Sequence, residues 1–248
     1  MCGRFVSTSP PERIATYFGA DIDVEDLGAK YNVAPTDDIY AVVAKPAVDP
    51  RPGERTARAL EAFHWGLLPS WAKDRKMAAR MINARAETLA EKPAFKAVFR
   101  KHRCIIPMDG FYEWKAGAEG GPVGARGKPL KQPYFVHRAD GEPLAVAGLW
   151  SAWRDRTAGR DAPWLHTASV ITTTANQTMS AIHDRMPVIL PKSMWDLWLD
   201  PANDNIAVLS QLLAPAPDDL LVMHPVSTEV NNVRNEGAHL IAPVPGGS

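Results

Sequence analysis

The stretch CIIPMDGFYEWK at residues 104–115 carries the pattern that decides the fold. A short apolar run ends at Asp109 and Gly110, which are turn formers, and a second run that is rich in aromatic residues follows. Similar brief apolar runs bounded by turn formers recur at residues 39–44, 60–63, 134–137, 144–149 and 168–172. Runs of about four to eight residues have the length of strands rather than helices. We therefore expect an antiparallel-rich system of sheets.

Short helices are expected between these strands. Apolar residues recur with helical spacing at residues 93–102, 176–182, 192–199 and 205–212, and polar or proline residues precede each run. Near the start, Ser9 reads as an N-cap with proline at the first helical position, and Gly19 as the stop. Residues 116–132 hold five glycines and two prolines, which predicts a mobile loop between two strands. The helices are expected to pack outside the sheets, which makes the fold class α+β.

Length and charge bound the organisation of the chain. The 248 residues, of which 46% are hydrophobic, suit one large domain, for which we expect residues 1–243 with a short tail at 244–248. The 28 Lys and Arg residues balance the 28 Asp and Glu residues. Residues 71–104, however, hold ten basic and three acidic residues, whereas residues 193–223 hold five aspartates and no Lys or Arg. This asymmetry fits one face that meets phosphates, although an ordinary solvated surface would give the same pattern.

Cysteine usage and hydropathy exclude several classes of protein. Only Cys2 and Cys104 are present, which excludes a cysteine-based zinc site and a disulfide framework and favours a reducing compartment. No signal-peptide core and no apolar run long enough to span a bilayer is found. We expect a cytoplasmic protein without metal, cofactor or membrane partner.

Cys2 directly follows the initiator Met1, and its position is the strongest chemical signal in the chain. Removal of Met1 would leave an α-amine and a thiol on one residue. An α-amine with a pKa of about 7.7–8.0 is roughly 10–20% neutral at pH 7, whereas a lysine is only about 0.04% neutral. The amine can form an imine with an aldehyde, and the thiol can then close a five-membered thiazolidine. The alternative is a small buried cysteine that happens to lie near the start.

Four more residues are candidates for the same polar site. Glu113 lies between two aromatic residues, where burial would favour its protonated form and suit a general acid or base; a salt bridge to Lys115 is the alternative. His183 follows a short predicted helix and precedes Asp184, which suits a proton-transfer group oriented by a neighbour, although a histidine of this kind taken alone is structural roughly twice as often. Asn83 and Arg85 would face one side of a strand, unless they are turn or cap residues.

Two tryptophans introduce the basic stretch. Trp71 leads directly into it, and an aromatic residue beside Arg and Lys can stack a base while phosphates are paired. Core packing is the alternative, and for Trp65 we favour it.

Together these segments resemble the SOS response-associated peptidase (SRAP) family. The motifs occur in one joint order from residue 2 to about Pro243, with Ala72 where some members carry a second adjacent aromatic residue. The matching segments are residues 1–5, 31–35, 65–66, 82–88, 110–115, 182–187 and 224–227.

The resemblance implies a pseudo-barrel of antiparallel strands flanked by helices, and binding of abasic sites in single-stranded DNA with covalent coupling through residue 2. It implies that Cys2 is the nucleophile, that Asn83 and Glu113 position groups and transfer protons, and that His183 is the acid/base of the imine steps. The implied DNA contacts are Arg4, Pro35, Trp71, Arg85, Thr172 and Arg185. A monomer with some abasic-site lyase activity is expected.

Two other functions stay open at this point. A cysteine peptidase could use Cys2 with Glu113 or His183, if only to process the bond after Met1. A noncovalent reader of damaged or modified DNA would not need Cys2 at all.

Overall fold

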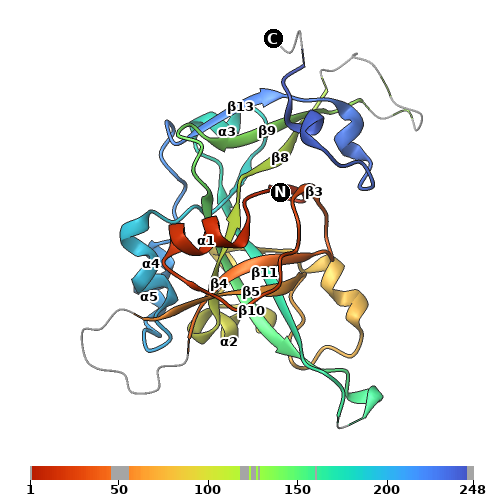
Figure 1. Cartoon of the computed structure of the whole chain (residues 1–248). Coiled ribbons are helices and arrows are strands. Elements are labelled where there is room, and N and C mark those ends of the chain that lie inside the picture. The colour runs from red at the N-terminus through yellow and green to blue at the C-terminus, as the bar shows by residue number, and fades with distance from the viewer. Residues whose placement is uncertain are drawn as a thin grey trace.

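Strands and short helices alternate along the chain (Figure 1). The computed structural model describes residues 2–45, 56–117, 129–159 and 161–244, together with residues 123 and 127. The strands are β1 (Phe5–Ser7), β2 (Asp21–Ile22), β3 (Lys30–Val33), β4 (Asp38–Ala44), β5 (Arg58–Trp65), β6 (Asn83–Arg85), β7 (Arg103–Met108), β8 (Gly110–Lys115), β9 (Gln132–Arg138), β10 (Leu144–Trp153), β11 (Leu165–Thr174), β12 (Arg185–Pro187) and β13 (Leu221–Pro225). The α-helices are α1 (Pro11–Phe18), α2 (Pro93–Lys101), α3 (Gln177–Ser180), α4 (Trp195–Leu199) and α5 (Ile206–Gln211). The 3₁₀ turns are η1 (Arg75–Arg80), η2 (Ala86–Thr88), η3 (Arg156–Ala158), η4 (Lys192–Met194), η5 (Thr228–Asn231) and η6 (Ala238–Ile241).

Five strands close into a small barrel. The order β11-β10-β7-β4-β5 is antiparallel throughout, and β5 then returns to β11 through a short parallel contact of His64 with Thr167 and Trp65 with Ala168. A second sheet, in the order β13-β9-β8-β1-β3, lies over one end of the barrel (Figure 1). The expected single α+β domain with an antiparallel-rich barrel is confirmed, and the parallel contacts of β11 with β5 and β6 and of β2 with β5 are additions to it.

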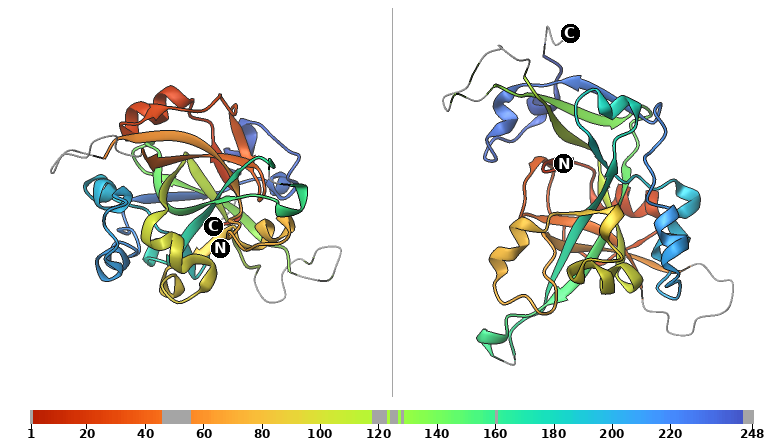
Figure 2. Two further views of the ribbon diagram at one scale, coloured as in Figure 1. Left: turned by 90° about the horizontal axis from the view of Figure 1, so that it is seen from below. Right: turned by 180° about the vertical axis from the view of Figure 1, so that it is seen from behind.

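The barrel strands are apolar on both faces because each face is covered. On β4, Ile39, Ala41 and Val43 belong to the interior core, whereas Tyr40 and Val42 belong to a second core under the helices. This alternation is the period-two pattern of a strand. Figure 2 shows the helices arranged around the outside of the barrel, as the sequence predicts. None of the described helices is long and apolar enough to cross a membrane.

The predicted elements are found with three corrections to their ends. Helix α1 begins at Pro11 and has no side-chain cap, because the Ser9 hydroxyl instead donates to Asp109 Oδ1 at 2.5 Å. Helix α3 covers only Gln177–Ser180, with Asn176 as its cap. The segment at residues 192–199 is divided into η4 and α4. Gly19 ends α1 with a φ of 62°, as predicted.

The predicted basic face has to be corrected at Arg103. This side chain is 2% exposed and therefore cannot reach DNA. Its guanidinium donates to the carbonyl oxygens of Phe99, Trp198 and Asn203 at 3.0, 2.6 and 2.9 Å. Arg103 thus ties the end of α2 to the loop after α4, and the count of basic residues along the sequence could not separate this role from a surface role.

Two predictions fall largely on residues outside those described. The loop at residues 116–132 joins β8 to β9 as expected, but most of it lies beyond the described residues, and its predicted mobility stays a prediction. The boundary at residue 243 also stays a prediction. The Val244 amide donates to the Pro225 carbonyl at 3.0 Å, and residues 245–248 are not described.

Gly66 makes the barrel closure possible. It follows Trp65 directly, has a φ of 131°, and donates its amide to the Ala168 carbonyl at 2.8 Å. A Cβ at this position would lie 2.4 Å from the Ala78 carbonyl oxygen. Only glycine accommodates both the backbone angle and the close approach of η1.

We predict that Gly66→Ala lowers the free energy of unfolding by at least about 3 kcal/mol, because backbone strain and a backbone clash add. Gly141→Ala is the matched control: its φ is 73°, but a Cβ there would meet nothing within 4 Å. Strain alone predicts a loss of about 1 kcal/mol for the control. Denaturant melts of both variants measure the difference, and equal losses would contradict the role assigned to the close approach.

Candidate functional site

Strand β11 assembles much of the candidate site. The short strand β6 pairs with it in parallel, so that Asn83 lies opposite Val170 and Arg85 opposite Thr172. On the same stretch, β12 pairs antiparallel, and Arg185 lies opposite Thr174. Segments about a hundred residues apart in the sequence therefore meet beside Thr172 and Thr174. Asn83 and Arg85 lie on a strand, as expected. Arg85 is also the N-cap residue of η2, as the alternative allowed, but its side chain makes no capping hydrogen bond.

Cys2 enters this site from the other sheet. Strand β1 pairs with β8 so that Phe5 lies opposite Phe111, and the Tyr112 amide donates to the Arg4 carbonyl at 3.0 Å. Continuing this register places the start of the chain beside Glu113. The Asn83 side chain donates from Nδ2 to the Cys2 carbonyl at 2.7 Å. Asn83 thereby fixes the backbone of residue 2.

Glu113 and His183 form an acid–base pair next to Cys2. Glu113 is 3% exposed, and its Oε1 lies 3.8 Å from His183 Nε2. Lys115, the partner in the predicted alternative, is exposed at the end of β8, whereas Glu113 is buried. The site therefore brings together a carboxylate and an imidazole whose charges affect each other.

The imidazole of His183 is held by its own neighbours. Nδ1 lies 2.8 Å from Asp184 Oδ1 and 3.0 Å from the Arg185 amide. The carboxylate requires a proton on Nδ1, whereas the amide requires a bare Nδ1, so the two contacts favour opposite tautomers. The ring can therefore present either a donor or an acceptor toward Glu113. The sequence predicted orientation of His183 by a neighbour, and the contact with Asp184 agrees with that prediction.

The Cys2 thiol is buried completely and protonated at neutral pH. Burial, followed by the nearby Glu113 carboxylate, raises the pKa of the thiol to about 12. Within the part of the chain that the structure describes, its Sγ donates a long hydrogen bond to the Arg4 carbonyl at 3.9 Å. Beside it, Asn83 Oδ1 is buried and accepts no hydrogen bond from any described residue. The site thus offers an unused acceptor next to the backbone of residue 2.

Arginine side chains line a surface hollow that leads to this pair. The hollow has a volume of about 520 Å³ and is lined by Arg85, Thr174, His183, Asp184 and Arg185. Arg85 is exposed, whereas Thr172 is fully buried beneath it.

Arg185 already has an acidic partner. It binds both carboxylate oxygens of Glu87 at 2.6 and 3.0 Å and donates to the Thr172 carbonyl at 2.7 Å. Glu87 was part of a sequence motif but was not predicted as a site residue. A phosphate at Arg185 would have to displace or share this exposed carboxylate.

Arg4 serves the architecture as well. It donates to Asn32 Oδ1 and to the Val230 carbonyl, both at 2.8 Å. Asn32 in turn donates to the carbonyls of Asn232 and Asn235, both at 3.0 Å. These contacts attach the C-terminal segment around η5 to β1 and β3. Asn32 is 1% exposed, and sequence reasoning did not find its role.

The two remaining candidates stand apart from this cluster. The Trp71 side chain is 54% exposed on the turn after β5, and Pro35 is half-buried before Thr36, which has a φ of 76°. Within the described chain, neither makes a hydrogen bond to the residues named above. Trp65 is fully buried, which confirms the preferred assignment of that residue to the core.

Comparison with known proteins gives one consistent family. The family model described as SOS response associated peptidase (SRAP) matches residues 1–233. The chain is 37% identical to the abasic site processing protein YoaM of Bacillus subtilis, over 97% of each chain. It is 32% identical to the abasic site processing protein YedK of Escherichia coli, over 98% of this chain and 100% of that protein. A solved structure from Bacteroides thetaiotaomicron shares the fold, with a TM-score of 0.79 and 24% identity over 98% of this chain and 100% of that one.

The buried thiol leads to a prediction about reactivity. An ordinary thiol approaches full ionisation near pH 9, whereas a thiol with a pKa near 12 is still protonated there. We expect Cys2 of the folded Cys104→Ser variant to react with iodoacetamide at pH 9 at least about 100-fold more slowly than free cysteine, with a rate that still rises above pH 10. Mass spectrometry follows the labelling. A rate that levels off near pH 9 would show that the thiol is not held in this way.

Proposed function

The chain belongs to the SOS response associated peptidase (SRAP) family, and we propose that it binds abasic sites in single-stranded DNA and couples to them covalently through Cys2. Curated relatives at 30–37% identity are named abasic site processing proteins. The observation that carries the finer proposal is the position of Cys2, whose backbone is held by Asn83 beside the Glu113–His183 pair. Met1 lies outside the described residues, and the proposal includes its removal.

The α-amine of Cys2 makes the first bond in this proposal. It attacks the C1′ aldehyde of the open abasic sugar, and loss of one water gives an imine. The protonated state of the thiol supports this order, because burial raises the pKa of the thiol far above neutral and disfavours the thiolate at pH 7. The vacant Asn83 Oδ1 can accept a hydrogen from the amine and orient its lone pair.

The thiol makes the second bond. Sγ adds to the imine carbon, its proton passes to the imine nitrogen, and a thiazolidine results without any oxidation or reduction. Sulfur and imine belong to the same residue, so this closure is intramolecular and does not require an ionised thiol in advance. Water exclusion at the fully buried side chain protects the imine until the ring is closed.

Glu113 and His183 handle the protons in this proposal. Glu113 protonates the ring oxygen of the closed sugar, the C1′–O4′ bond breaks, and the C1′ hydroxyl loses its proton to solvent, which releases the aldehyde. His183 serves the imine steps; as a base it can also remove a C2′ proton, which expels the 3′ phosphate by β-elimination. Lyase activity therefore competes with thiazolidine closure. Glu113 Oε1 and His183 Nε2 lie 3.8 Å apart, which supports the proposal that both side chains act on the same part of the sugar.

The DNA backbone is proposed to lie along the hollow at Arg85 and Arg185. Arg4, Pro35 and Trp71 complete the proposed contact set, with Trp71 as an exposed aromatic residue along the path of the strand. Thr172 is fully buried, so its proposed role is to position Arg185 through its carbonyl, which accepts from Arg185 at 2.7 Å. A single strand suits these contacts, because a duplex would first have to be unpaired. The protein is proposed to act as a monomer on DNA in the cytoplasm, and its two free cysteines suit a reducing compartment.

The peptidase alternative is less well supported by the site. Cysteine peptidases use a thiol of lowered pKa, whereas burial raises the pKa of the Cys2 thiol. A protein that only binds damaged DNA noncovalently would not need Cys2 beside Glu113 and His183, so this arrangement favours the covalent proposal.

We predict that Cys2→Ala loses the heat-stable adduct with an abasic single strand but still forms an imine that borohydride traps, because the α-amine survives. Cys104→Ala is the matched control: it removes the other fully buried cysteine and should crosslink like the wild type. Denaturing gels of heated and of reduced samples separate the two adducts. A heat-stable adduct with Cys2→Ala would rule out the thiazolidine.

The proton assignments predict opposite behaviour of two variants. Glu113→Gln should slow crosslinking to a natural abasic site by about 10²–10⁴-fold and have much less effect when the substrate presents an open aldehyde. His183→Ala should suppress strand cleavage more than thiazolidine formation. Single-turnover rates on both substrates provide the measurement, with thermal melts as a check on folding. An equal reduction by both variants on both substrates would contradict separate roles.

A further inference from the structure

Two tryptophans remain outside the core of this protein. The chain has eight tryptophans, and only Trp71 and Trp164 have strongly exposed side chains, at 54% and 61%. Trp164 comes directly before β11, at the free end of the β10–β11 hairpin. Figures 1 and 2 show this hairpin projecting beyond the barrel. Burial of an indole stabilises a protein strongly, so two exposed indoles on one surface indicate a site of contact with a partner.

Both tryptophans belong to one surface. The turn that carries Trp71 packs on the hairpin through a small core of Leu68, Ala72, Ala78 and Trp153. Trp153 Nε1 also donates to the Ala72 carbonyl at 2.8 Å. Ser70, the neighbour of Trp71, lines a hollow together with Trp164. The turn and the hairpin are thus fixed to each other rather than independent.

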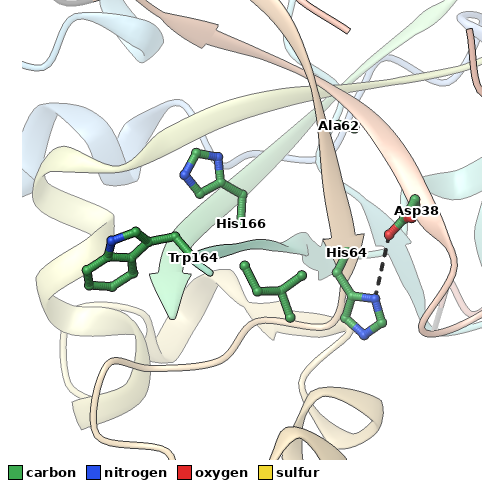
Figure 3. A pocket seen from close by; sticks show the side chains of 6 residues that line it. Asp38, Ala62, His64, Trp164 and His166 are labelled. Carbon is green, nitrogen blue, oxygen red and sulfur yellow. Dashed lines mark ion pairs between the residues drawn. The ribbon is translucent and has the colours of Figure 1, made fainter. Parts of the chain in front are cut away.

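Trp164 stands between two hollows. One, of about 140 Å³, is lined by Ser70, Ala152, Arg154, Arg156 and Trp164. The other, of about 290 Å³, is lined by Asp38, Ala62, His64, Trp164, Leu165 and His166 (Figure 3). Both edges of the indole therefore border open space, and one of these spaces is flanked by two arginines.

The surface has the charge of a phosphate-binding site. The Arg154 guanidinium lies 4.9 Å from the centre of the Trp164 ring. Residues 71–80 hold four basic residues and one acid, and residues 154–161 hold three arginines and two aspartates. Asp155 accepts from the Thr157 amide, Asp38 lies 3.7 Å from His64, and Glu61 lies 3.6 Å from His166. The two segments together hold seven basic and three acidic residues, and this excess of positive charge attracts a polyanion.

Strand β11 connects this surface to the proposed lesion site. Thr172 lies beside the arginine-lined hollow and Leu165 at the hairpin, seven residues away on the same strand. At about 3.3 Å per residue the separation is about 23 Å. This corresponds to about seven stacked nucleotides, and to fewer in an extended strand.

We propose that the strand flanking an abasic site, on one side of the lesion only, runs from the Arg85–Arg185 hollow to the β10–β11 hairpin. There a base stacks on Trp164, and Arg154 and Arg156 contact the adjacent phosphates. Aromatic stacking beside arginine is the usual means of holding single strands without sequence preference. This inference rests on the proposed function, and it adds a second contact region that is separate from the reacting residues.

The test uses a tetrahydrofuran abasic analogue, which has no aldehyde and reports binding without chemistry. Three single strands carry it: one with two nucleotides on each side, one with a long 5′ flank only, and one with a long 3′ flank only. Trp164→Ala should weaken binding to just one of the long-flank strands, by about 5–100-fold in anisotropy titrations, and leave the short strand unchanged. Arg156→Gln should act on the same strand and reduce its salt dependence by about one phosphate contact.

Leu197→Ala is the control, because Leu197 is another exposed apolar side chain, 38% exposed, and lies on α4. It should bind all three strands like the wild type. The proposal would be overturned if Trp164→Ala bound both long strands like the wild type, or if it bound all three strands equally weakly. The first of these results would assign the surface to another kind of partner. The two proposals can fail separately. If Trp164→Ala weakens binding to one long-flank strand, but the wild type forms no adduct with natural abasic strands, the contact surface is supported and the covalent function is rejected.

Discussion

The site depends on the closure of the barrel by the parallel contact between β5 and β11. Trp65 lies at this closure, fully buried, and reaches both halves of the site. Its ring packs edge-on against Phe5 with centroids 5.0 Å apart, three residues from Cys2. Its Nε1 donates to the Ile82 carbonyl at 3.0 Å, one residue before Asn83. One indole therefore sets the distance between the proposed nucleophile and the amide that holds it.

Burial of Cys2 has two opposite effects on its chemistry. Removal from water raises the pKa of the thiol and disfavours its ionised form, which works against a direct attack by sulfur. The same burial keeps competing water away from the sulfur. In the proposed reaction the amine is needed first and the thiol only afterwards, so a protonated and sheltered sulfur suits the order of the steps. Glu113, itself buried, adds to the rise in the thiol pKa and lies close enough to take part in proton transfer.

Local patterns were sufficient to predict the longer strands, but not the short strands β1, β2, β3, β12 and β13 or the long-range contacts. Continuous apolar runs bounded by turn formers locate β4, β7 and the start of β10, because both faces of a barrel strand are buried. The parallel returns of β5 and β6 to β11 carry no local signal. Asn32, Glu87 and Arg103 act through partners about a hundred or more residues away, or through backbone carbonyls, and residue type alone does not disclose such contacts. Cys2, Glu113 and His183 were candidates from their residue types and neighbours, and the joint order of the motifs then implied their roles.

Intact-mass spectrometry of the protein mixed with an abasic single strand tests the central claim most directly. The account predicts one new species, in which the protein lacks Met1 and carries one oligonucleotide, with a mass lower by one water than the sum of the two. This mass should persist after heating. An adduct on protein that retains Met1, or no adduct at all on protein with a free Cys2 amine, would contradict covalent coupling through residue 2.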